Sequence, residues 1–563
     1  MEVVMLTNQT PAAGVSGGVI FIVGHRHPDT DSILSAIAYA HLKNRIGLNA
    51  VACRCGDVNP ETKHLLEKFN QPEPLLIQDA RAQMDETELD DPNAIPPTTI
   101  LREVIEAFDD DHKVFTVLDD KRKLLGLVTS STIGDILWGD TAKAIDLLSR
   151  TPIENITKAI EGRLLYAPAE TRHNGKVSIT AISANRLANY DLADRIVIMG
   201  NDTNAQIEAI NKGAAILILV WTNQVAPMVL EAAREKKCGV ILSGHGAMNT
   251  SRYLYYSIPV SMVMDKDNLV VFSEEEFVDD VRDQMLKSRF RAYPIMDSEN
   301  RVMGLTSRYR ILTAPKRHFI LVDHNERKQA VPNIEKAEIL EIVDHHRVGD
   351  ITSDRPISFR NEPVGATATI IAKMYREMDI VPDKEIASLM LAAIIADTLN
   401  FRSPTTSAAD HNMAAWLVEL TGLDTEDLAK EIFAQSSKNA LADLHGMLNG
   451  DVKEFDIAGG KVVISQLTMY RLNTIEAIES ELLAQMTKEA EAAKADLWLM
   501  VFTSARDNGS TFYAVGKGAK YIAEIYPNLP GESHSFQKGI VSRKNQIVPQ
   551  LSLYLRNVSS WNS

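Results

Sequence analysis

The sequence predicts an α/β protein with a parallel-sheet domain, a C-terminal mixed α/β domain, and a third, α+β region inserted within the first. Three observations predict this fold class. A chain of 563 residues exceeds what one hydrophobic core usually supports. Short apolar runs alternate with helical patterns near both ends of the chain, as in βαβ units. Residues 99–128 and 275–305 share one layout, which indicates an internal repeat.

The composition is that of a globular protein with an acidic balance. Hydrophobic residues make up 45% and charged residues 24% of the chain, which are ordinary proportions. Lys+Arg 59 against Asp+Glu 75 gives a net charge of -16, which argues against general nucleic-acid binding. An acidic protein that binds phosphates must supply positive charge locally, from metal ions or from clustered Lys and Arg.

Cysteine usage and the N-terminus indicate a cytoplasmic enzyme. Cys53, Cys55 and Cys238 make no disulfide framework, and the Cys-Arg-Cys pair lacks a second Cys or His pair at zinc spacing. The first eighteen residues lack a basic segment followed by an apolar one. No uninterrupted apolar run reaches the ~18 residues of a membrane span, so no membrane partner is expected.

The first element is a βαβ unit. Residues 19–24 predict a buried strand, residues 33–47 carry apolar residues at helical spacing and end at a glycine, and residues 49–54 predict a second strand. Helix capping and loop solvation explain the polar residues after the first strand as well as metal binding does, on this motif alone. That polar loop holds His25, Asp29 and Asp31.

The middle of the chain predicts an inserted region, from about residue 73 to 315. An acidic, turn-rich connector at residues 79–97 leads into a helix and two strands, and the same helix–strand–strand layout returns at residues 275–305. In both copies an aspartate, Asp119 or Asp297, precedes a glycine by seven residues. Residues 195–264 alternate strand and helix between the copies and predict a separate α/β module.

Acidic and histidine residues end several apolar elements of the last part of the chain. Asp323 follows a strand at residues 318–322, Asp344-His345-His346 ends the strand that begins near residue 339, and Asp397 ends a helix at residues 386–396. Residues 428–448 predict a helical connector, and residues 451–548 a mixed α/β domain.

These element ends predict a two-metal site. Carboxylates that converge without a cation repel each other and are costly to bury. Carboxylate and imidazole ligands together suit Mn, Co, Fe or Zn better than Mg alone. Two ions about 3.5–4 Å apart can activate a bridging water and clamp phosphoryl oxygens.

Two further segments could bind phosphate. Gly365-Ala366-Thr367 opens a helix and could hold an anion through backbone N–H groups, although plain helix-start chemistry explains it at least as well. Ser542-Arg543-Lys544 lies between the strand-like residues 539–541 and 547–548. Arg and Lys suit phosphate binding, but alone this pair would be a solvated surface pair.

Six strings occur along the chain in this order: GHRHPDTDS, ILVDHNER, VDHHR, EPVGATATI, ADTLNF and VSRKNQIVP. With these strings the sequence resembles the family II inorganic pyrophosphatases of the DHH phosphoesterase superfamily. The resemblance covers about residues 19–72 and 316–550. The sequence has no glycine-rich GGGH-like motif of the kind found in the exopolyphosphatase and oligonucleotide phosphodiesterase relatives.

The resemblance implies hydrolysis of pyrophosphate to two phosphates by direct attack of a metal-bridged hydroxide. It implies two tight Mn²⁺ or Co²⁺ sites and Mg²⁺ that arrives with the substrate. The first metal would be held by His25, Asp29 and Asp323, and the second by Asp31, Asp323, His345 and Asp397. The substrate phosphates would be contacted by His346, Lys453, Arg543 and Lys544. Asp344 would orient its neighbours, and His27 stands where many members have Asn.

The insertion resembles a pair of CBS half-domains separated by a DRTGG-type domain. The resemblance implies regulation by AMP, ADP, ATP or diadenosine polyphosphate. The usual ribose-binding pattern, Thr or Ser followed three residues later by Asp, is broken, because Thr129 is followed by Thr132 and Ser307 by Arg310. The DRTGG-like segment has Gly200-Asn201-Asp202-Thr203 instead of the peptide that names it. The predicted nucleotide contacts are Thr129, Arg289, Arg291, Ser307 and Arg310.

The resulting prediction is a regulated inorganic pyrophosphatase, expected to form a homodimer or a higher oligomer through the CBS region. Another DHH phosphoesterase and a non-catalytic nucleotide sensor are the alternatives, and the sensor would require missing ligands. The expected domains are a catalytic domain (1–72 and 316–430), two CBS halves (73–150 and 253–315), a DRTGG-like domain (151–252), a linker (431–450) and a C-terminal substrate-binding domain (451–563).

Overall fold

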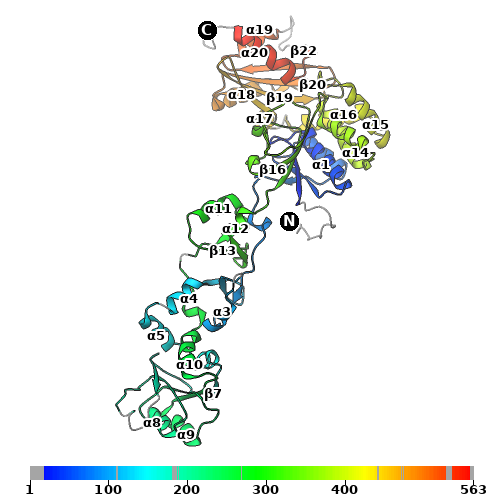
Figure 1. Cartoon of the computed structure of the whole chain (residues 1–563). Helices are drawn as coiled ribbons and strands as arrows, with labels where there is room; N and C mark the ends of the chain where they lie inside the picture. The colour runs from blue at the N-terminus through cyan, green and yellow to red at the C-terminus, as the bar shows by residue number, and fades with distance from the viewer. Residues whose placement is uncertain are drawn as a thin grey trace. The chain divides into compact units, whose positions relative to one another are not determined.

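The chain divides into two compact units, coloured by residue number in Figure 1. Residues 1–81 and 316–563 form the first unit, and residues 82–315 form the second. An insertion within a discontinuous domain is therefore present. The computed structural model describes residues 18–109, 112–137, 139–180, 187, 189–267, 269–440, 443–470, 472, 475–527 and 536–557.

A six-stranded parallel sheet forms the centre of the first unit. Its strand order is β17-β16-β15-β1-β2-β3, and every neighbouring pair is parallel. β15 lies directly beside β1, so the chain returns from the insertion to the sheet that it left. This confirms the predicted α/β class. The strands are β1 (Ile20–Val23), β2 (Ala50–Arg54), β3 (Leu75–Leu76), β15 (His318–Val322), β16 (Glu338–Asp344) and β17 (Ser358–Asn361).

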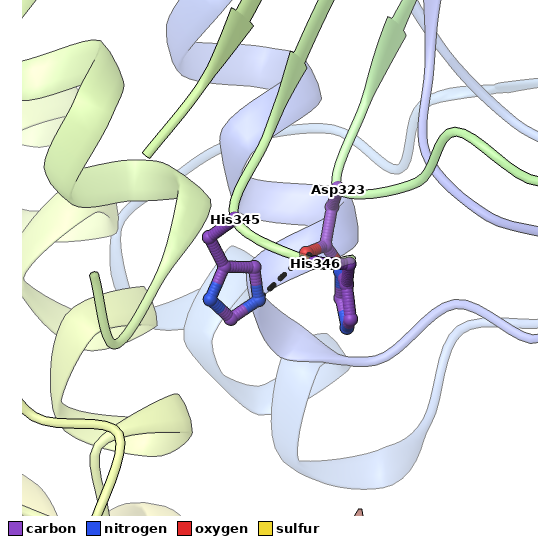
Figure 2. Close-up of side chains that lie close together, drawn as sticks. All are labelled: Asp323, His345 and His346. Atoms are coloured by element: carbon purple, nitrogen blue, oxygen red, sulfur yellow. Dashed lines mark ion pairs between the residues drawn. The ribbon is translucent and has the colours of Figure 1, made fainter. Parts of the chain in front are cut away.

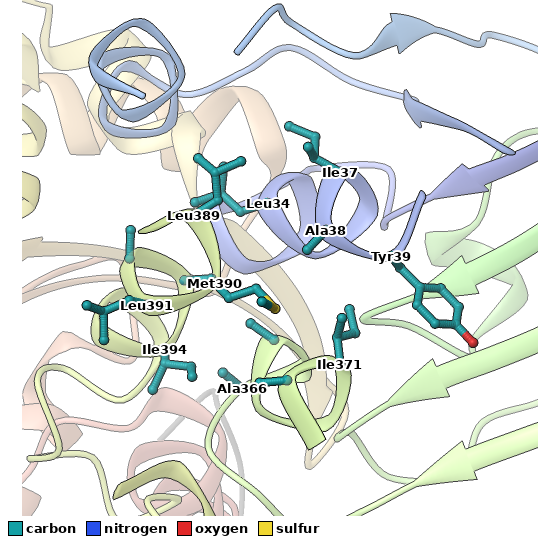
Figure 3. Packing of buried hydrophobic residues seen from close by; sticks show 14 of the residues in the cluster. Leu34, Ile37, Ala38, Tyr39, Ala366, Ile371, Leu389, Met390, Leu391 and Ile394 are labelled. Atoms are coloured by element: carbon teal, nitrogen blue, oxygen red, sulfur yellow. The ribbon is translucent and has the colours of Figure 1, made fainter. Parts of the chain in front are cut away.

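Helices bury one face of this sheet in the largest core cluster of the described residues. α14 is buried along nearly its whole length because its apolar residues lie all round the helix. Leu34, Ile371 and Met390 come from three different helices and are fully buried in the same cluster (Figure 3). The helices of this layer are α1 (Thr30–Arg45), α2 (Pro60–Lys68), α13 (Thr367–Glu377), α14 (Lys384–Asp397) and α15 (Ala408–Thr421).

The first predicted helix begins earlier than expected. Asp29 is the N-cap of α1 and its carboxylate accepts a hydrogen bond from the Ser32 backbone N–H at 2.9 Å. Asp31 therefore lies in the first turn of the helix. The prediction that it lies in the preceding loop is wrong. The reason is capping: an aspartate side chain satisfies a backbone donor that the first turn leaves unpaired.

The C-terminal part of the first unit contains a five-stranded mixed sheet with a buried core on each face. The predicted helical connector is two helices, α16 (Thr425–Ala440) and α17 (Leu444–Gly450). The strands, in sheet order, are β18 (Val452–Ile457), β19 (Gly460–Met469), β20 (Leu497–Ser504), β21 (Gly509–Val515) and β22 (Phe536–Lys538). The helices are α18 (Glu479–Ala493), α19 (Ala519–Ile525) and α20 (Val548–Asn557).

The predicted strand setting of Ser542-Arg543-Lys544 is wrong. Residues Arg543–Ile547 form a π-helical turn that continues into α20. Ser542 caps this turn, because its hydroxyl accepts the backbone N–H of Asn545 at 3.2 Å. The apolar residues on both sides of the motif favour strands in the sequence, but in the structure Ile547 ends the π-helical turn and Val548 begins α20.

The inserted unit contains the predicted repeat. Its two three-stranded sheets have the orders β4-β5-β6 and β12-β13-β14. Asp119 and Asp297 each accept the backbone N–H groups two and four residues later in their turns. The strands are β4 (Ala94–Ile95), β5 (Val114–Leu118), β6 (Leu124–Thr129), β12 (Phe272–Ser273), β13 (Ala292–Met296) and β14 (Val302–Ser307). The helices are α3 (Leu101–Ala107), α4 (Ser130–Leu137), α11 (Val278–Leu286) and α12 (Arg308–Leu312).

The two repeats exchange the chain segments that precede them. Asp265, ahead of the second repeat, pairs through its backbone with Leu127 of the first. Asp90, ahead of the first repeat, pairs in the same way with Leu305 of the second. Each repeat is thus completed by a segment of the other.

A five-stranded sheet of order β7-β11-β10-β9-β8 lies between the repeats in sequence and confirms the predicted α/β alternation. No helix of the described residues has the length and apolarity needed to cross a membrane. The strands are β7 (Arg163–Tyr166), β8 (Val177–Thr180), β9 (Ile196–Met199), β10 (Ile216–Leu219) and β11 (Gly239–Leu242). The helices are α5 (Thr141–Ser149), α6 (Ile153–Ala159), α8 (Thr203–Asn211), α9 (Pro227–Lys236) and α10 (Ala247–Leu254).

Candidate metal centre

The carboxyl ends of three adjacent parallel strands bring the predicted ligands together. His25 follows β1, Asp323 follows β15 directly, and His345 and His346 follow β16. β1, β15 and β16 are neighbours in the sheet. The side chains of Asp323, His345 and His346 lie close together below these strand ends (Figure 2). This edge is where open α/β sheets bind ligands.

Three overlapping groups of side chains have the composition and spacing of metal sites. In each group, one possible ligand atom per residue lies within 4.8 Å of the others. All six ligands predicted from the sequence belong to these groups, and His346 joins them. The groups are His25, Asp29 and Asp323; Asp31, His345 and Asp397; and Asp323, His345 and His346.

Asp323 lies between two of the groups. Its Oδ2 atom is 3.4 Å from Nε2 of His25, which is also 3.4 Å from Oδ2 of Asp29. Its Oδ1 atom is 3.4 Å from Nε2 of His345, which lies 3.5 Å from Oδ2 of Asp397. One carboxylate thus presents one oxygen to each side, the arrangement that a ligand shared by two ions needs.

The donor set fits divalent cations. Asp323 and Asp31 are each only 1% exposed, and a buried carboxylate is costly without a compensating charge. The buried Oδ2 of Asp323 has no hydrogen-bond partner among the described residues. His345 donates from Nδ1 to the Val364 carbonyl at 3.0 Å, which leaves Nε2 facing the carboxylates. An orphaned oxygen beside oriented imidazoles is what a metal ion would satisfy.

The proton affinities of the cluster reflect crowded buried charges. Burial and then the Asp323 carboxylate raise the pKa of Asp31 well above its usual value. Burial opposes the charged form of His345, but Asp323 and Asp397 raise the pKa of this histidine well above its usual value. Burial raises the pKa of Asp397 to about 7, with His345 opposing the shift. A cation entering the cluster would displace such protons.

The start of α13 is occupied by a carboxylate of the protein itself. Asp31 accepts hydrogen bonds from the backbone N–H of Thr367 at 2.6 Å and of Ala368 at 3.0 Å. The first N–H groups of a helix have no partner within the helix and carry partial positive charge. The backbone N–H groups of Thr367 and Ala368 are thus already bound by the Asp31 carboxylate, which takes the place of the phosphate considered for Gly365-Ala366-Thr367.

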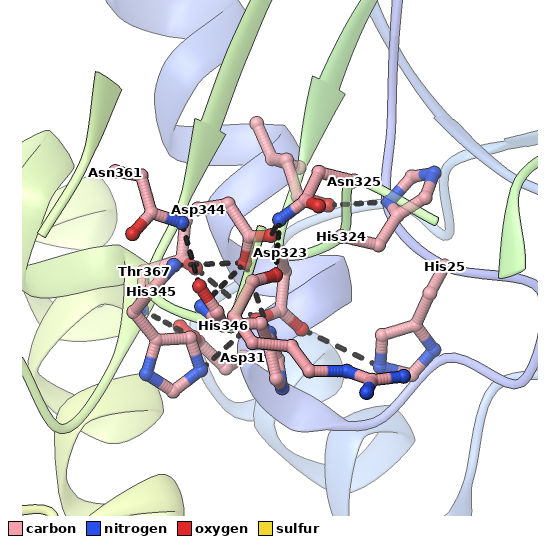
Figure 4. Close-up of polar contacts among 12 residues, drawn as sticks. His25, Asp31, Asp323, His324, Asn325, Asp344, His345, His346, Asn361 and Thr367 are labelled. Atoms are coloured by element: carbon pink, nitrogen blue, oxygen red, sulfur yellow. Dashed lines mark hydrogen bonds and ion pairs between the residues drawn. The ribbon is translucent and has the colours of Figure 1, made fainter. Parts of the chain in front are cut away.

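Asp344 orients the two histidines that follow it. This fully buried carboxylate accepts the backbone N–H of His345 at 2.8 Å and Nδ1–H of His346 at 2.9 Å, and it also contacts Asn325 (Figure 4). Despite burial, the bond and charge of His346 lower the pKa of Asp344 to about 2. Asn361 also donates to the His346 carbonyl, at 2.7 Å.

The cations predicted to bind phosphate differ in their surroundings. Lys453 lies on β18, and its charge acts on His25, Asp29 and Asp397. Desolvation and then the charge of Lys453 lower the pKa of Lys544, which also interacts with the Asp344 and Asp323 carboxylates. Lys453 and Lys544 are therefore near the cluster and near each other.

Arg543 is held within its own domain. Its side chain is buried, and its guanidinium donates to the Asp451 carboxylate at 2.6 Å and to the Asp451 and Ile464 carbonyls at 2.9 and 3.1 Å. No signal in the sequence pointed to Asp451 as its partner.

The predicted nucleotide contacts lie in the inserted unit. The hydroxyl of Thr129 is 3.1 Å from that of Thr132, which donates to the Asp265 carboxylate at 2.8 Å. In the second repeat Ser307 caps α12, and Arg310 donates to Asp90 at 2.9 Å and to Glu88 at 2.6 Å. The sequence pattern has no carboxylate next to Thr129 or Ser307. In the structure the exchanged segments place Asp265 beside Thr132 and Asp90 beside Arg310.

Arg289 and Arg291 are exposed in the segment between α11 and β13. They lie in sequence between two elements of the second repeat. A cavity of about 410 Å³ in the same unit is lined by residues such as Thr99, Phe115 and Lys158, and by none of the five predicted nucleotide contacts.

Several functional neighbours were missed from the sequence. Thr367 contacts two of the predicted ligands, Asn325 contacts Asp344, and Asp410 braces the start of α13. Thr367 lies within the string EPVGATATI, but a threonine at a helix start has no signature that identifies it as a partner of Asp323.

Comparisons with known proteins agree with the geometry. Residues 19–394 match the DHH family, N-terminal domain, and residues 430–554 match the DHHA2 domain. The chain is 33% identical over 537 residues to a cobalt-dependent inorganic pyrophosphatase of Clostridium perfringens, covering 95% of this chain and 98% of the relative. It is 29% identical over 542 residues to a probable manganese-dependent inorganic pyrophosphatase of Thermotoga maritima, covering 95% and 98%.

A solved structure is similar to part of this chain. It contains the CBS and DRTGG domains of the regulatory region of the Clostridium perfringens pyrophosphatase, complexed with the activator diadenosine tetraphosphate. The identity is 26%, the match covers 40% of this chain and 100% of that chain, and the TM-score is 0.38.

Proposed function

Because the chain belongs to the DHH family and, within it, to the inorganic pyrophosphatases, we propose that it hydrolyses inorganic pyrophosphate to two phosphates with the help of divalent transition-metal ions. One observation carries the proposal: Asp323 presents one oxygen to His25 and the other to His345. This arrangement supports a pair of ions that share one carboxylate. The relatives over nearly the whole chain are named as cobalt-dependent and manganese-dependent enzymes, which supports Co²⁺ or Mn²⁺ here.

The metal roles follow the two groups around Asp323. When bound, two such ions supply concentrated positive charge that makes water more acidic and neutralises phosphoryl oxygens. Mg²⁺ is proposed to arrive with the substrate. One ion would be held by His25, Asp29 and Asp323, and the other by Asp31, Asp323, His345 and Asp397.

The substrate would be bound by basic side chains beside the metal centre. His346, Lys453 and Lys544 lie near Asp323 or its partners, which supports contact with phosphate oxygens. Arg543 is proposed as a further phosphate contact whose guanidinium is oriented by Asp451. The charges of Lys453, Lys544 and Arg543 would lower the electrostatic cost of bringing a polyanion to an acidic protein.

A phosphate-release assay tests this function. The full chain is stripped of metal, reloaded with Mn²⁺, Co²⁺ or Mg²⁺, and given pyrophosphate, polyphosphate or short oligonucleotides. We expect turnover of pyrophosphate to exceed the others and to depend on Mn²⁺ or Co²⁺. Faster release from polyphosphate or oligonucleotides would favour another DHH phosphoesterase, and no turnover with any metal would favour a nucleotide sensor.

Regulation by adenine nucleotides is the second part of the proposal. The repeat pair supports two related sites, with Thr129 in the first repeat and Arg289, Arg291, Ser307 and Arg310 in the second. The regulatory region of the Clostridium perfringens pyrophosphatase is described with diadenosine tetraphosphate as activator. We assign CBS halves to 73–150 and 253–315 and a DRTGG-like domain to 151–252.

Binding and assay together test the regulation. Calorimetry with AMP, ADP, ATP and diadenosine tetraphosphate should give binding, and saturating nucleotide should change the rate of hydrolysis. Linkage requires that nucleotide affinity then differ with and without an occupied active site. Absence of binding, or binding with no change in rate, would contradict the regulatory role.

Assembly and location complete the proposal. We propose a homodimer: β17 is an edge strand of the six-stranded sheet, and Phe359 on it and nearby Val348 are exposed apolar residues. Light scattering should give twice the chain mass. We also propose a cytoplasmic location, because the three cysteines are free thiols, as in reducing compartments; cell fractionation tests it.

A further inference from the structure

Thr367, the first residue of α13, contacts two carboxylates of the candidate metal centre. Its backbone N–H donates to Asp31 at 2.6 Å, and its hydroxyl donates to Oδ1 of Asp323 at 3.1 Å. Asp31 lies in the first turn of α1 and Asp323 directly follows β15, so the two carboxylates come from different elements and different sequence motifs. We propose that Thr367 is a positioning residue that fixes the spacing between these two carboxylates, both of them proposed ligands of the second ion; this inference rests on the proposed metal-dependent function.

The hydroxyl selects which oxygen of Asp323 stays free. A threonine hydroxyl has a single hydrogen to donate, and here it is directed to Oδ1. Oδ2 keeps no hydrogen-bond partner among the described residues, so it remains available on the side of His25. A β-branched side chain is stiff at χ1, which makes Thr367 a more rigid donor than serine.

Asp323 needs such a constraint because its backbone is strained. Its φ of 63° lies in the left-handed region, which is costly for a residue with a side chain. Its N–H donates to the Val343 carbonyl at 2.9 Å, but among the described residues no backbone N–H donates to the Asp323 carboxylate. The Thr367 hydroxyl supplies a direct hydrogen bond to this carboxylate (Figure 4).

The position of Thr367 is set from its far side by Asp410 of α15. This carboxylate is fully buried and accepts the Gly365 N–H at 2.9 Å and the Thr369 hydroxyl at 2.5 Å. Its other bonds are with Ser407, from the backbone N–H at 2.6 Å and the hydroxyl at 2.8 Å. The residues on both sides of Thr367 are therefore anchored to one charge that touches neither proposed metal site.

Glycine is required where this segment passes α14. A Cβ added to Gly365 would lie 2.5 Å from Cγ2 of Thr398 and 3.0 Å from the Asp410 carboxylate. Thr398 directly follows Asp397, a proposed ligand of the second ion. The tight approach joins the start of α13 to the end of α14, so the carboxylates Asp31, Asp323 and Asp397 are positioned by one packed unit.

Replacing the hydroxyl while keeping the side-chain volume tests the inference. Thr367→Val in the full chain retains the backbone N–H to Asp31 and removes the donor to Asp323. Calorimetric titration with Mn²⁺ should show binding weakened roughly 10- to 100-fold, the usual cost of losing such a supporting bond. The visible absorption spectrum of the Co²⁺-loaded variant should change shape, and kcat should fall. Thr367→Ser should restore most of the affinity and the spectrum.

A matched control separates positioning from general packing. Thr421 is another buried threonine, whose hydroxyl donates to the Leu417 carbonyl at 2.8 Å and accepts the Leu423 backbone N–H at 3.3 Å, and none of these residues is a proposed metal ligand. Thr421→Val should leave Mn²⁺ affinity and the Co²⁺ spectrum unchanged. If Thr367→Val does not fold, as judged by thermal unfolding without metal, Thr367→Ala removes the same donor without added bulk.

The outcomes distinguish this inference from the proposed function. Wild-type protein that binds neither Mn²⁺ nor Co²⁺ would overturn the proposed function itself. The role of Thr367 alone would be overturned by a different result. In that case the wild type binds Mn²⁺, and a folded Thr367→Val or Thr367→Ala variant binds it with equal affinity and has the same Co²⁺ spectrum.

Discussion

Nε2 of His345 lies 3.4 Å from Oδ1 of Asp323, while the other oxygen of this carboxylate has no hydrogen-bond partner among the described residues. The two residues follow neighbouring parallel strands, so their proximity follows from the register of β15 and β16. Oδ1 of Asp323 faces His345, and the unsatisfied Oδ2 faces His25. Each oxygen could therefore bind a separate metal ion. The consequences of changing Asp323 are correspondingly large.

Asp323→Asn should abolish pyrophosphate hydrolysis, lowering turnover on the order of a thousandfold or more. Removing a single group that stabilises charge in the transition state can cost that much in kcat, and Asp323 is proposed to hold both ions. An amide presents one oxygen instead of two and carries no charge, so Mn²⁺ binding should weaken as well. Phosphate release and calorimetry measure the two effects. Asp354→Asn, in an exposed loop, is the control and should behave as wild type. Near-normal turnover of Asp323→Asn would sink the two-metal arrangement.

The sequence was sufficient to predict the positions of site residues that directly follow a strand. Asp323 and His345 directly follow apolar strands, and parallel strands align their carboxyl ends, so this pair could be predicted. Thr367 is 44 residues from Asp323, and their contact depends on how α13 packs below the strand edge. Arg543 and Asp451 are 92 residues apart and meet only after the C-terminal sheet has formed. Periodicity carries no information on such packing.

The same reasoning explains the errors. The residues beside Arg543 are β-branched and apolar, which favours strand locally, but their burial against the C-terminal core is achieved in a helical turn. The pairing of Asp265 with Thr132 needed the exchange of segments between repeats, which spans 133 residues.

Removal of metal should destabilise the first unit. Without metal ions the buried carboxylates of Asp31 and Asp323 crowd each other, with only neighbouring histidines such as His345 to offset their charge. A ligand present at about 1,000 times its Kd stabilises a folded protein by about 4 kcal/mol. Differential scanning calorimetry should therefore give a Tm several degrees higher with Mn²⁺ than with a chelator. Asp323→Asn should lose most of this difference; an equal gain in that variant would mean that Mn²⁺ stabilises the protein elsewhere.

Asp451→Asn should impair substrate use without affecting the metals. The carboxylate of Asp451 accepts from Arg543 at 2.6 Å, and this charge-assisted hydrogen bond helps to hold the guanidinium in a fixed orientation. We expect kcat/KM for pyrophosphate to fall roughly tenfold, equivalent to about 1.4 kcal/mol, the scale of one charge-assisted hydrogen bond. Mn²⁺ titration of the same variant should match wild type. A parallel loss of Mn²⁺ affinity would instead indicate a wider structural defect.

Glu88→Gln should strengthen binding of nucleotides at the second repeat. Arg310 donates to Glu88 at 2.6 Å and to Asp90 at 2.9 Å, so both carboxylates compete with any phosphate for its guanidinium. Removing the charge of Glu88 should lower the Kd for ATP several-fold, measured by calorimetry. Glu299→Gln is the matched control, because Glu299 pairs with Arg301 in a turn of the same repeat. Weaker binding in Glu88→Gln would show that Glu88 orients Arg310 for phosphate.

The inserted unit should lose stability in mild acid through His173. This side chain is 8% exposed, its Nε2 is 3.1 Å from the Thr151 carbonyl oxygen, and its Nδ1 is buried without a partner among the described residues. Burial lowers the pKa of His173 below its usual value. As the pH falls below about 6.5, the unfolded chain binds a proton that the folded unit resists, so the unfolding free energy falls until the folded pKa is reached.

The slope of that loss is at most about 1.4 kcal/mol per pH unit for one proton. Hydrogen exchange of peptides covering β8 to β11 at pH 7.5 and 5.0 measures it in the full chain. His173→Gln keeps a neutral polar side chain at all these pH values and should remove part of the pH dependence. His112→Gln, at a histidine that is 46% exposed in the same unit, should leave the dependence unchanged. If His173→Gln has the wild-type slope, another group controls the acid sensitivity of this unit.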